Sequence, residues 1–219
     1  IEVENTVNAD VYDNIATNNT GGILVFNMPQ LHQVGGAVRV FDNQVFANNT
    51  ENFGHPGTPV ASVPAGTGVI VNSNDNVEIF DNMISDNQNG NIIISSLLTT
   101  GYQDISAADT FDPYPEGIVI YDNAFSGGGN APDTPERAMA LTMMFSNDGR
   151  LPDIIWDGLA DDAKLVDGTL PDALKICIDN GDVGMLNANG PSGFTEPSTD
   201  MSPFACTLDK LPEITLDRA

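Results

Sequence analysis

One short phrase, repeated four times, decides the fold. The stretch ADVYDN at residues 9–14 returns as VRVFDN at 38–43, as VEIFDN at 77–82 and as IVIYDN at 118–123. Each copy places an aromatic residue, an aspartate and an asparagine in the same order after a short apolar segment. In-register repetition of a whole phrase indicates that the chain stacks copies of one structural unit.

A second set of short apolar segments precedes these phrases: IEVEN (1–5), GILVF (22–26), GVIVN (68–72) and NIIIS (91–95). Equivalent positions recur after 22 residues, from Val3 to Val25, or after 23, from Val71 to Ile94. Short strands at this period, separated by Asn, Asp and Gly turns, are typical of a solenoid. We therefore predict an all-β fold, a right-handed parallel β-helix with a small C-terminal helical and extended capping region.

Alternation along the repeated phrase assigns the side chains to faces, because successive residues of a strand point to opposite sides. The residues predicted to point into the core are Val38, Val40, Val77, Ile79, Ile118 and Ile120. Arg39, Glu78 and Val119 are predicted to point outward. Stacked coils would then enclose one continuous core.

The asparagine that ends each phrase is predicted to form a structural ladder, comprising Asn14, Asn43, Asn82 and Asn123. Asparagine tolerates the left-handed backbone conformation of a sharp turn, and its amide can hydrogen-bond to the same residue one coil away. The preceding aspartates form a column that should mostly face water. A calcium site along that column is the alternative. Apart from calcium, no cofactor or metal is predicted.

The aromatic residues of the phrase, Tyr12, Phe41, Phe80 and Tyr121, are predicted to point outward in one column, which we call the aromatic column. Exposed rings in a row are costly unless something covers them. Either sugar rings stack on the column, giving a glycan-binding stripe, or the C-terminal part of the chain lies across it. We favour coverage by the chain itself.

Three long loops, 27–36, 48–67 and 96–116, interrupt the coils. The first and third replace the same corner of the solenoid, so we expect them to lie near one another. They carry His32 and Tyr114, which we take as candidate ligand-binding residues because loops on a rigid scaffold commonly hold functional sites. No catalytic residue is predicted.

The repeat weakens after residue 125. We expect residues 1–125 to form the coils with their inserted loops, and residues 126–219 to complete the same domain with a covering helix, degenerate last coils and a cap. Thr134 and Pro135 suit the N-cap and first position of a helix over 134–145. A cap prevents the open end of a solenoid from aggregating.

Cys177 and Cys206 lack the short paired spacing of a zinc site. In an exported protein we expect a disulfide bond between them, closing a loop of about 30 residues and contributing roughly 3 kcal/mol. Two free buried thiols are the alternative.

Charge narrows the range of partners. Seven basic against 31 acidic side chains give a formal net charge of −24. Such a surface repels nucleic acid and anionic membranes, and it repels polyuronates unless cations mediate. No apolar run approaches the roughly 18–20 residues of a membrane span, so no transmembrane segment is predicted.

The run from NADVYDNIATNNTGGILVFNMPQL through VRVFDN and PAGTGVIVNSNDNVEIFDN resembles exported bacterial proteins described only as parallel β-helix repeat proteins. Their fold is similar to that of the pectin-lyase-like superfamily. The resemblance covers most of residues 1–125, and the CTLDKLPEITL tail is also similar. It implies a right-handed parallel β-helix, export to the periplasm or cell surface, often with a lipid anchor, and further coils before Ile1. It implies no established activity.

Three functions are weighed. The first is a non-catalytic exported protein that binds a surface polysaccharide or a partner protein on the cell surface. The second is a polysaccharide-active enzyme, a lyase, epimerase or hydrolase, with its site at the 27–36 and 96–116 loops or in missing N-terminal coils. The third is a structural spacer. We favour the first, because lyases and epimerases usually need a basic residue in the groove and Arg39 is the only one among residues 1–125.

Overall fold

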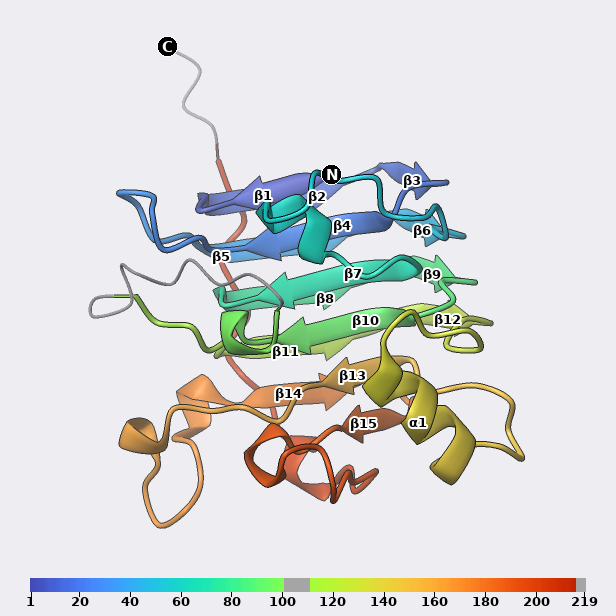
Figure 1. Cartoon of the computed structure of the whole chain (residues 1–219). Coiled ribbons are helices and arrows are strands. Elements are labelled where there is room, and N and C mark those ends of the chain that lie inside the picture. The colour runs from blue at the N-terminus through green and yellow to red at the C-terminus, as the bar shows by residue number, and fades with distance from the viewer. Residues whose placement is uncertain (101–110, 216–219) are drawn as a thin grey trace.

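The computed structural model describes residues 1–100 and 111–215, which form three parallel sheets and one α-helix (Figure 1). Sheet A contains β1 (Glu2–Glu4), β4 (Gly21–Phe26), β7 (Thr67–Asn72), β10 (Gly90–Ser95), β13 (Ile154–Trp156) and β15 (Met185–Asn187). Sheet B contains β2 (Val7–Tyr12), β5 (Gly36–Phe41), β8 (Asp75–Phe80), β11 (Ile118–Tyr121) and β14 (Ile176–Asp179). Sheet C contains β3 (Ile15–Thr17), β6 (Gln44–Phe46), β9 (Met83–Ser85) and β12 (Ala124–Ser126).

The chain visits sheets A, B and C in turn, and neighbours within each sheet come from successive coils. This order is that of a parallel β-helix, so the predicted all-β parallel class is confirmed. Val3 pairs with Val25, and Val71 pairs with Ile94, which are the positions that define the period. Beyond residue 125, β13, β14 and β15 extend sheets A and B, whereas sheet C ends at β12.

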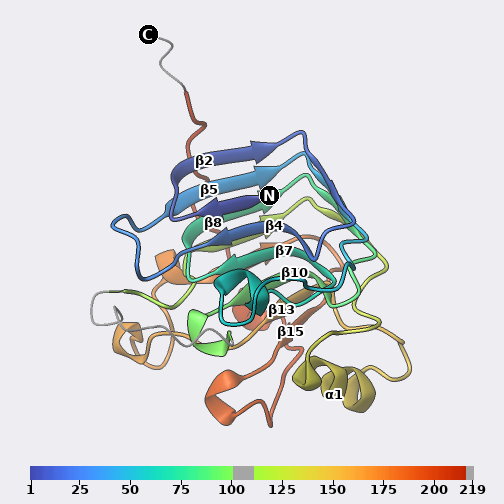
Figure 2. The same ribbon diagram turned by 45° about the horizontal axis from the view of Figure 1, so that its top comes forward.

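Figure 2 shows the strands of the sheets stacked around the inside of the coils. The core inside them consists mainly of Val and Ile. All the predicted inward residues are fully buried, at 0% exposure: Val38, Val40, Val77, Ile79, Ile118 and Ile120. Glu78 and Val119 face outward from the coil, as expected from the alternation, yet they are only 2% and 9% exposed. Another part of the chain therefore covers the outer face of sheet B.

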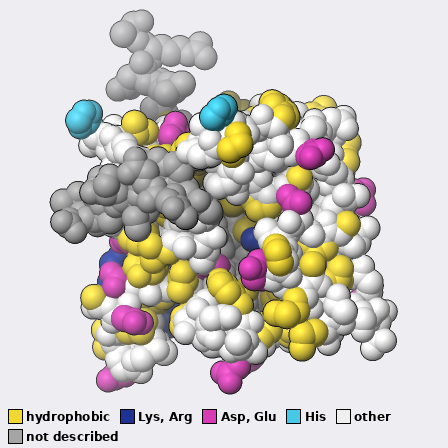
Figure 3. Space-filling view, in the orientation of Figure 1, with side chains coloured by type: hydrophobic (Ala, Val, Ile, Leu, Met, Phe, Trp, Pro, Cys, Tyr) yellow, Lys and Arg dark blue, Asp and Glu magenta, His cyan; other side chains and the backbone are white. Residues whose placement is uncertain are grey.

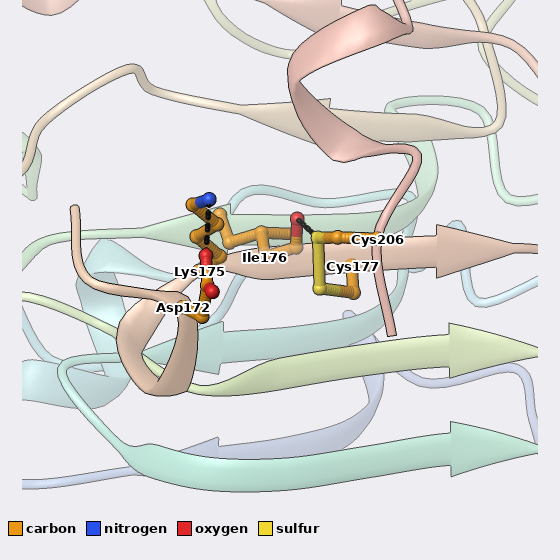
Figure 4. The surroundings of a disulfide bond; sticks show 5 residues. All are labelled: Asp172, Lys175, Ile176, Cys177 and Cys206. Atoms are coloured by element: carbon orange, nitrogen blue, oxygen red, sulfur yellow. Dashed lines mark hydrogen bonds and ion pairs between the residues drawn. A yellow bond between two sulfur atoms is a disulfide. The ribbon is translucent and has the colours of Figure 1, made fainter. Parts of the chain in front are cut away.

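That cover is the C-terminal strap, residues 206–215, which runs across sheet B toward the N-terminal coil (Figure 1). It begins at a disulfide bond between Cys206 and Cys177 of β14 (Figure 4). Cys177, Val119 and Glu78 follow one another in a single outward column, one residue from each strand. The Leu211 N–H donates a hydrogen bond to Glu78 Oε1 at 2.8 Å. The strap thus follows this column from the disulfide at β14 to Glu78 on β8.

Asparagine side chains join the coils at the corner between sheets B and C. The Nδ2 group of each donates to Oδ1 of the next, at 2.9–3.1 Å, along Asn14, Asn43, Asn82, Asn123 and Asn180. The ladder thus extends one rung beyond the predicted four. The prediction that these asparagines adopt the left-handed conformation is wrong. The preceding aspartates adopt it instead, with φ of 53–57° at Asp13, Asp42, Asp81 and Asp122. The asparagine side chain is thereby free to turn inward and bond along the stack.

A second asparagine ladder lies at the next corner, between sheets C and A. Asn19 donates to Asn48, Asn48 to Asn87, and Asn87 to Asn91, at 2.9–3.1 Å. The first three lie five residues after a rung of the first ladder. This constant spacing was the sequence signal for the second ladder.

The α-helix α1 (Pro135–Met144) packs against the outer face of sheet A, where Leu141 lies against Leu151, Ile155 and Leu186. Thr134 is its N-cap residue and Pro135 its first residue, although the Thr134 side chain makes no capping hydrogen bond. Short 3-10 helices occupy the loops: η1 (Pro59–Ser62), η2 (Leu97–Thr99), η4 (Asp162–Lys164), η5 (Asp172–Leu174), η6 (Gly190–Ser192) and η7 (Ser202–Phe204).

Candidate ligand-binding groove

A groove runs along the outer face of sheet A, parallel to the axis of the stack. Its upper part, about 410 Å³, is bounded on one side by residues 59–64 and on the other by Leu97, Thr99 and Thr100. Its lower part, about 830 Å³, lies between α1 and residues 194–197. Thr99, Thr134 and Arg137 line both parts, so the two parts adjoin. Figure 3 shows this face, on which hydrophobic side chains are frequent and basic ones rare.

The walls come from the two corners that flank sheet A. The insertion between β6 and β7 supplies residues 59–64, and the segment between β12 and β13 supplies α1. The opposite wall follows the ends of β10 and β15. Insertions that are irregular in the sequence therefore line up in space, because every corner of a solenoid lies above the corner of the previous coil.

The floor consists of two columns of outward side chains, joined by the strand register. One column is aliphatic beyond its first residue: Glu2, Leu24, Ile70, Ile93, Ile155 and Leu186. The other is mainly polar: Glu4, Phe26, Asn72 and Ser95. Asn72 Nδ2 donates to Ser95 Oγ at 2.9 Å. The floor thus sets aliphatic side chains, which are at most 8% exposed, beside hydrogen-bonding groups.

The sequence carried a signal for this floor. The strands of sheet A are apolar on both faces, as in ILVF (23–26), VIV (69–71) and III (92–94). A strand that is apolar throughout is typical of a sheet covered on both sides, whereas alternation indicates a solvated face. The strands of sheet B alternate between apolar residues that point inward and polar residues that point outward, among them Asp10, Arg39 and Glu78. The pattern of the strands thus distinguishes the outer face of sheet A, which is apolar, from that of sheet B, which is largely charged.

Arg137 is the basic residue of the groove. Its Nη1 donates to Asn89 Oδ1 at 3.3 Å, and among the described residues it forms no ion pair within 4 Å. Burial lowers the pKa of Arg137 to about 10, while the negative charge of Asp157 opposes this shift. The guanidinium is still charged at neutral pH. It presents hydrogen-bond donors at the junction of the two parts of the groove.

Asp157 holds one wall in place. Its Oδ2 accepts hydrogen bonds from the Ser96 N–H at 2.7 Å and from Thr99 Oγ1 at 2.8 Å, and its Oδ1 accepts one from the Leu159 N–H at 3.0 Å. Burial raises the pKa of Asp157, and these hydrogen bonds lower it. Because both carboxylate oxygens are engaged, Asp157 positions the wall rather than offering itself to a ligand.

The rings of the aromatic column stack face to face. Ring centroids lie 5.1 Å apart for Tyr12 and Phe41, and 4.9 Å apart for both Phe41–Phe80 and Phe80–Tyr121, with interplanar angles of 10°, 7° and 2°. Each inner ring thus has both faces against neighbouring rings, and a sugar could reach only its edge. A glycan stripe along the column, which needs free ring faces, loses its support.

The strap covers one end of the column and leaves the other open. Lys210 Nζ lies 4.1 Å from the centroid of the Tyr121 ring, which is 9% exposed. Burial raises the pKa of Tyr121 to about 12. At the other end Tyr12 is 52% exposed. The expected coverage by the C-terminal region is therefore seen at Tyr121 but not at Tyr12.

The loops that carry His32 and Tyr114 lie on the same side of the solenoid, at the corner between sheets A and B (Figure 1). His32 is exposed and Tyr114 half-buried. Residues 101–110 of the 96–116 loop lie outside the described residues. A third insertion, 157–175, occupies the same corner. Burial, followed by the negative charges of Asp161 and Asp162 in that insertion, raises the pKa of Tyr114.

Comparison with known proteins identifies no family. No protein-family model, no curated protein and no solved structure matches the chain. Within residues 1–100 and 111–215, no helix has the length and apolar character needed to cross a membrane.

Proposed function

We propose that the chain is a non-catalytic binding protein that holds a neutral polysaccharide along the groove on sheet A. The observation that supports this most strongly is the floor of the groove, an aliphatic strip beside a polar one. A sugar chain has the same two-sided character, with apolar C–H faces and hydroxyl edges. Binding sites of this kind are largely apolar, with a few polar groups that fix orientation.

Charge favours a neutral ligand. Glu2 and Glu4 lie at the upper end of the groove, Glu136 and Glu196 line its lower part, and the whole chain carries −24. A polyanion would be repelled by this field. Hydroxyl groups can accept from Arg137 and donate to the carboxylates, so a neutral sugar satisfies both kinds of group.

The test is to incubate the protein with soluble neutral polysaccharides (a β-glucan, a mannan and a galactan) and with a polyuronate, with and without calcium. The mixtures are then resolved by size. We expect an intact neutral polysaccharide to elute together with the protein. If no neutral polysaccharide in the panel alters the elution of the protein, the proposal fails.

A matched pair of variants locates the site. Val60 on the groove wall is 53% exposed, and Val166 on the 157–175 insertion, outside the groove, is 61% exposed. Val60→Asp adds a charge at the wall and should weaken binding at least about tenfold, whereas Val166→Asp should leave the affinity unchanged. Equal affinities for the two variants would place the ligand elsewhere.

A polysaccharide-active enzyme is the second candidate, because Arg137 supplies a basic residue in a groove that also holds carboxylates. The same experiment separates the two functions. Polysaccharide chains that are shorter after incubation would identify an enzyme. If the Arg137→Ala variant no longer shortens them, the groove is the site of that activity.

We also propose export to the periplasm or cell surface. A disulfide bond between Cys177 and Cys206 is compatible with an oxidising compartment. The resemblance to exported β-helix repeat proteins stays a prediction, since no match tests it.

A further inference from the structure

Three carboxylates converge at the corner between sheets A and B, on a different face from the groove floor. Asp75 begins β8, and Asp112 and Glu116 belong to the insertion before β11. One oxygen of each lies within 4.8 Å of the others. The backbone fixes this arrangement, because the Glu116 N–H donates to Asp75 Oδ1 at 3.0 Å and the Asn76 N–H donates to the Glu116 carbonyl at 2.9 Å.

A lysine only partly balances these charges. Lys164, from the third insertion, bonds to Asp112 and lies 2.6 Å from Glu116 Oε2. Three carboxylates and one ammonium leave the cluster with two negative charges when all are ionised. Uncompensated charges of like sign in a partly buried site are unfavourable.

A second observation concerns Glu116 itself, which is only 2% exposed. Its Oε2 is held by Lys164, but its Oε1 is enclosed and accepts no hydrogen bond from the described residues. A buried carboxylate oxygen without a donor or a cation is costly. Glu116 therefore keeps one buried carboxylate oxygen that a cation bound at the cluster could take as a ligand.

We propose that this corner is a calcium site, with Asp75 and Glu116 as the principal protein ligands and Asp112 beside them. All the ligands are oxygen atoms, which suits a hard cation and not zinc, whose sites use Cys and His. Oxygens on opposite sides of a Ca²⁺ ion lie about 4.6–5.2 Å apart, since each bond is 2.3–2.6 Å. The three oxygens, which all lie within 4.8 Å of one another, are close enough to share one such ion. The two positive charges of a bound Ca²⁺ ion would balance the two net negative charges of the cluster.

Such an ion would tie together two segments of the corner: the start of β8, which carries Asp75, and the insertion before β11, which carries Asp112 and Glu116. Ser73 Oγ already donates to the Pro113 carbonyl at 2.6 Å and accepts from the Leu97 N–H at 2.8 Å. Leu97 begins one wall of the groove. The ion would therefore stiffen that wall from behind, while the proposal itself does not depend on a polysaccharide ligand.

The test is calorimetric titration of chelator-treated protein with CaCl₂ and, in parallel, MgCl₂, together with thermal unfolding in both salts. We expect one calcium site per chain, a higher Tm with calcium, and weaker binding of magnesium because the donors are irregularly placed. The proposal is overturned if titration with CaCl₂ gives no heat of binding and calcium does not change the Tm.

Three variants assign the site. Glu116→Gln and Asp75→Asn should each weaken calcium binding at least about tenfold, and their unfolding curves without calcium report whether they fold. Asp172→Asn is the control, because Asp172 is a 92% exposed carboxylate paired with Lys175 on the same corner. The assignment is contradicted if Glu116→Gln and Asp75→Asn both bind calcium as tightly as the unmodified protein. It is also contradicted if Asp172→Asn weakens calcium binding as much as they do.

Lys164→Met provides a check that does not depend on a loss of binding. It removes the competing ammonium and frees the oxygens of Asp112 and Glu116. We expect tighter calcium binding than in the unmodified protein. Weaker binding in a folded Lys164→Met variant would mean that the cluster is an ion-pair network built around the lysine and not a calcium site.

Discussion

At the scale of single residues, the stack depends on side chains that satisfy the backbone at the corners. Asn82 shows this most fully. The carbonyls of Val40 and Phe80 and the Asn123 Oδ1 share the two N–H groups of its Nδ2, and its Oδ1 accepts from both nitrogens of Asn43. Apart from the bond to the partly buried Phe80 carbonyl, these hydrogen bonds are buried, where water cannot replace a lost partner.

Asn82→Ala should therefore lower the free energy of unfolding by about 2–4 kcal/mol, because it leaves several buried donors and acceptors unpaired. The matched control is Asn14→Ala at the half-exposed end of the same ladder, where solvent can replace the partners and the loss should stay near or below about 1 kcal/mol. Urea unfolding measures both. Equal losses would show that ladder position does not matter.

At the scale of elements, the strap is held by one covalent bond and a few polar contacts. The disulfide fixes its start at β14, Leu211 bonds to Glu78, and Lys210 lies over Tyr121. The buried column of Glu78 and Val119 on sheet B is covered by this segment. Burial raises the pKa of Glu78, and the Leu211 N–H and then Arg39 oppose the shift.

Reduction of the disulfide should lower the free energy of unfolding by roughly 3–4 kcal/mol, from the entropy gained by a loop of about 30 residues in the unfolded chain. It should also speed amide exchange in residues 207–215 more than in β8. The double variant Cys177→Ala, Cys206→Ala should behave like the reduced protein. Unchanged exchange in the strap would mean that its noncovalent contacts suffice.

At the scale of the whole molecule, charge opposes the compact fold. The formal charge of −24 is distributed over one chain, and the described residues contain only five ion pairs. Like charges held close together destabilise a compact state, and salt screens them over roughly 8–10 Å at physiological ionic strength.

Raising monovalent salt from about 10 mM to about 150 mM should therefore raise the Tm by a few degrees. Sodium chloride and choline chloride should act alike, because screening depends on ionic strength and not on the cation. Calcium should add a further increase at far lower concentration if it binds at the corner. A Tm that stays constant with salt would show that repulsion is already balanced by the local pairs.

The sequence by itself determined the parts of the structure that follow a period. The 22–23-residue repeat, the inward faces of Val40 and Ile79 and the asparagine ladder all depend on local alternation and on equivalent positions in successive coils. Stacking places such positions above one another without further information. The disulfide was likewise predictable, because Cys177 had one available partner.

Only the tertiary structure decided the groove, the coverage of sheet B and the carboxylate cluster. These sites are assembled by insertions, which follow no period and whose side chains meet only once the corners are stacked. Arg137 lies 42 residues after Ser95, the last residue of β10, yet both residues line the same groove. Lys164 reaches Glu116 from another insertion. Distances between such residues depend on loop paths, and local sequence patterns do not encode them.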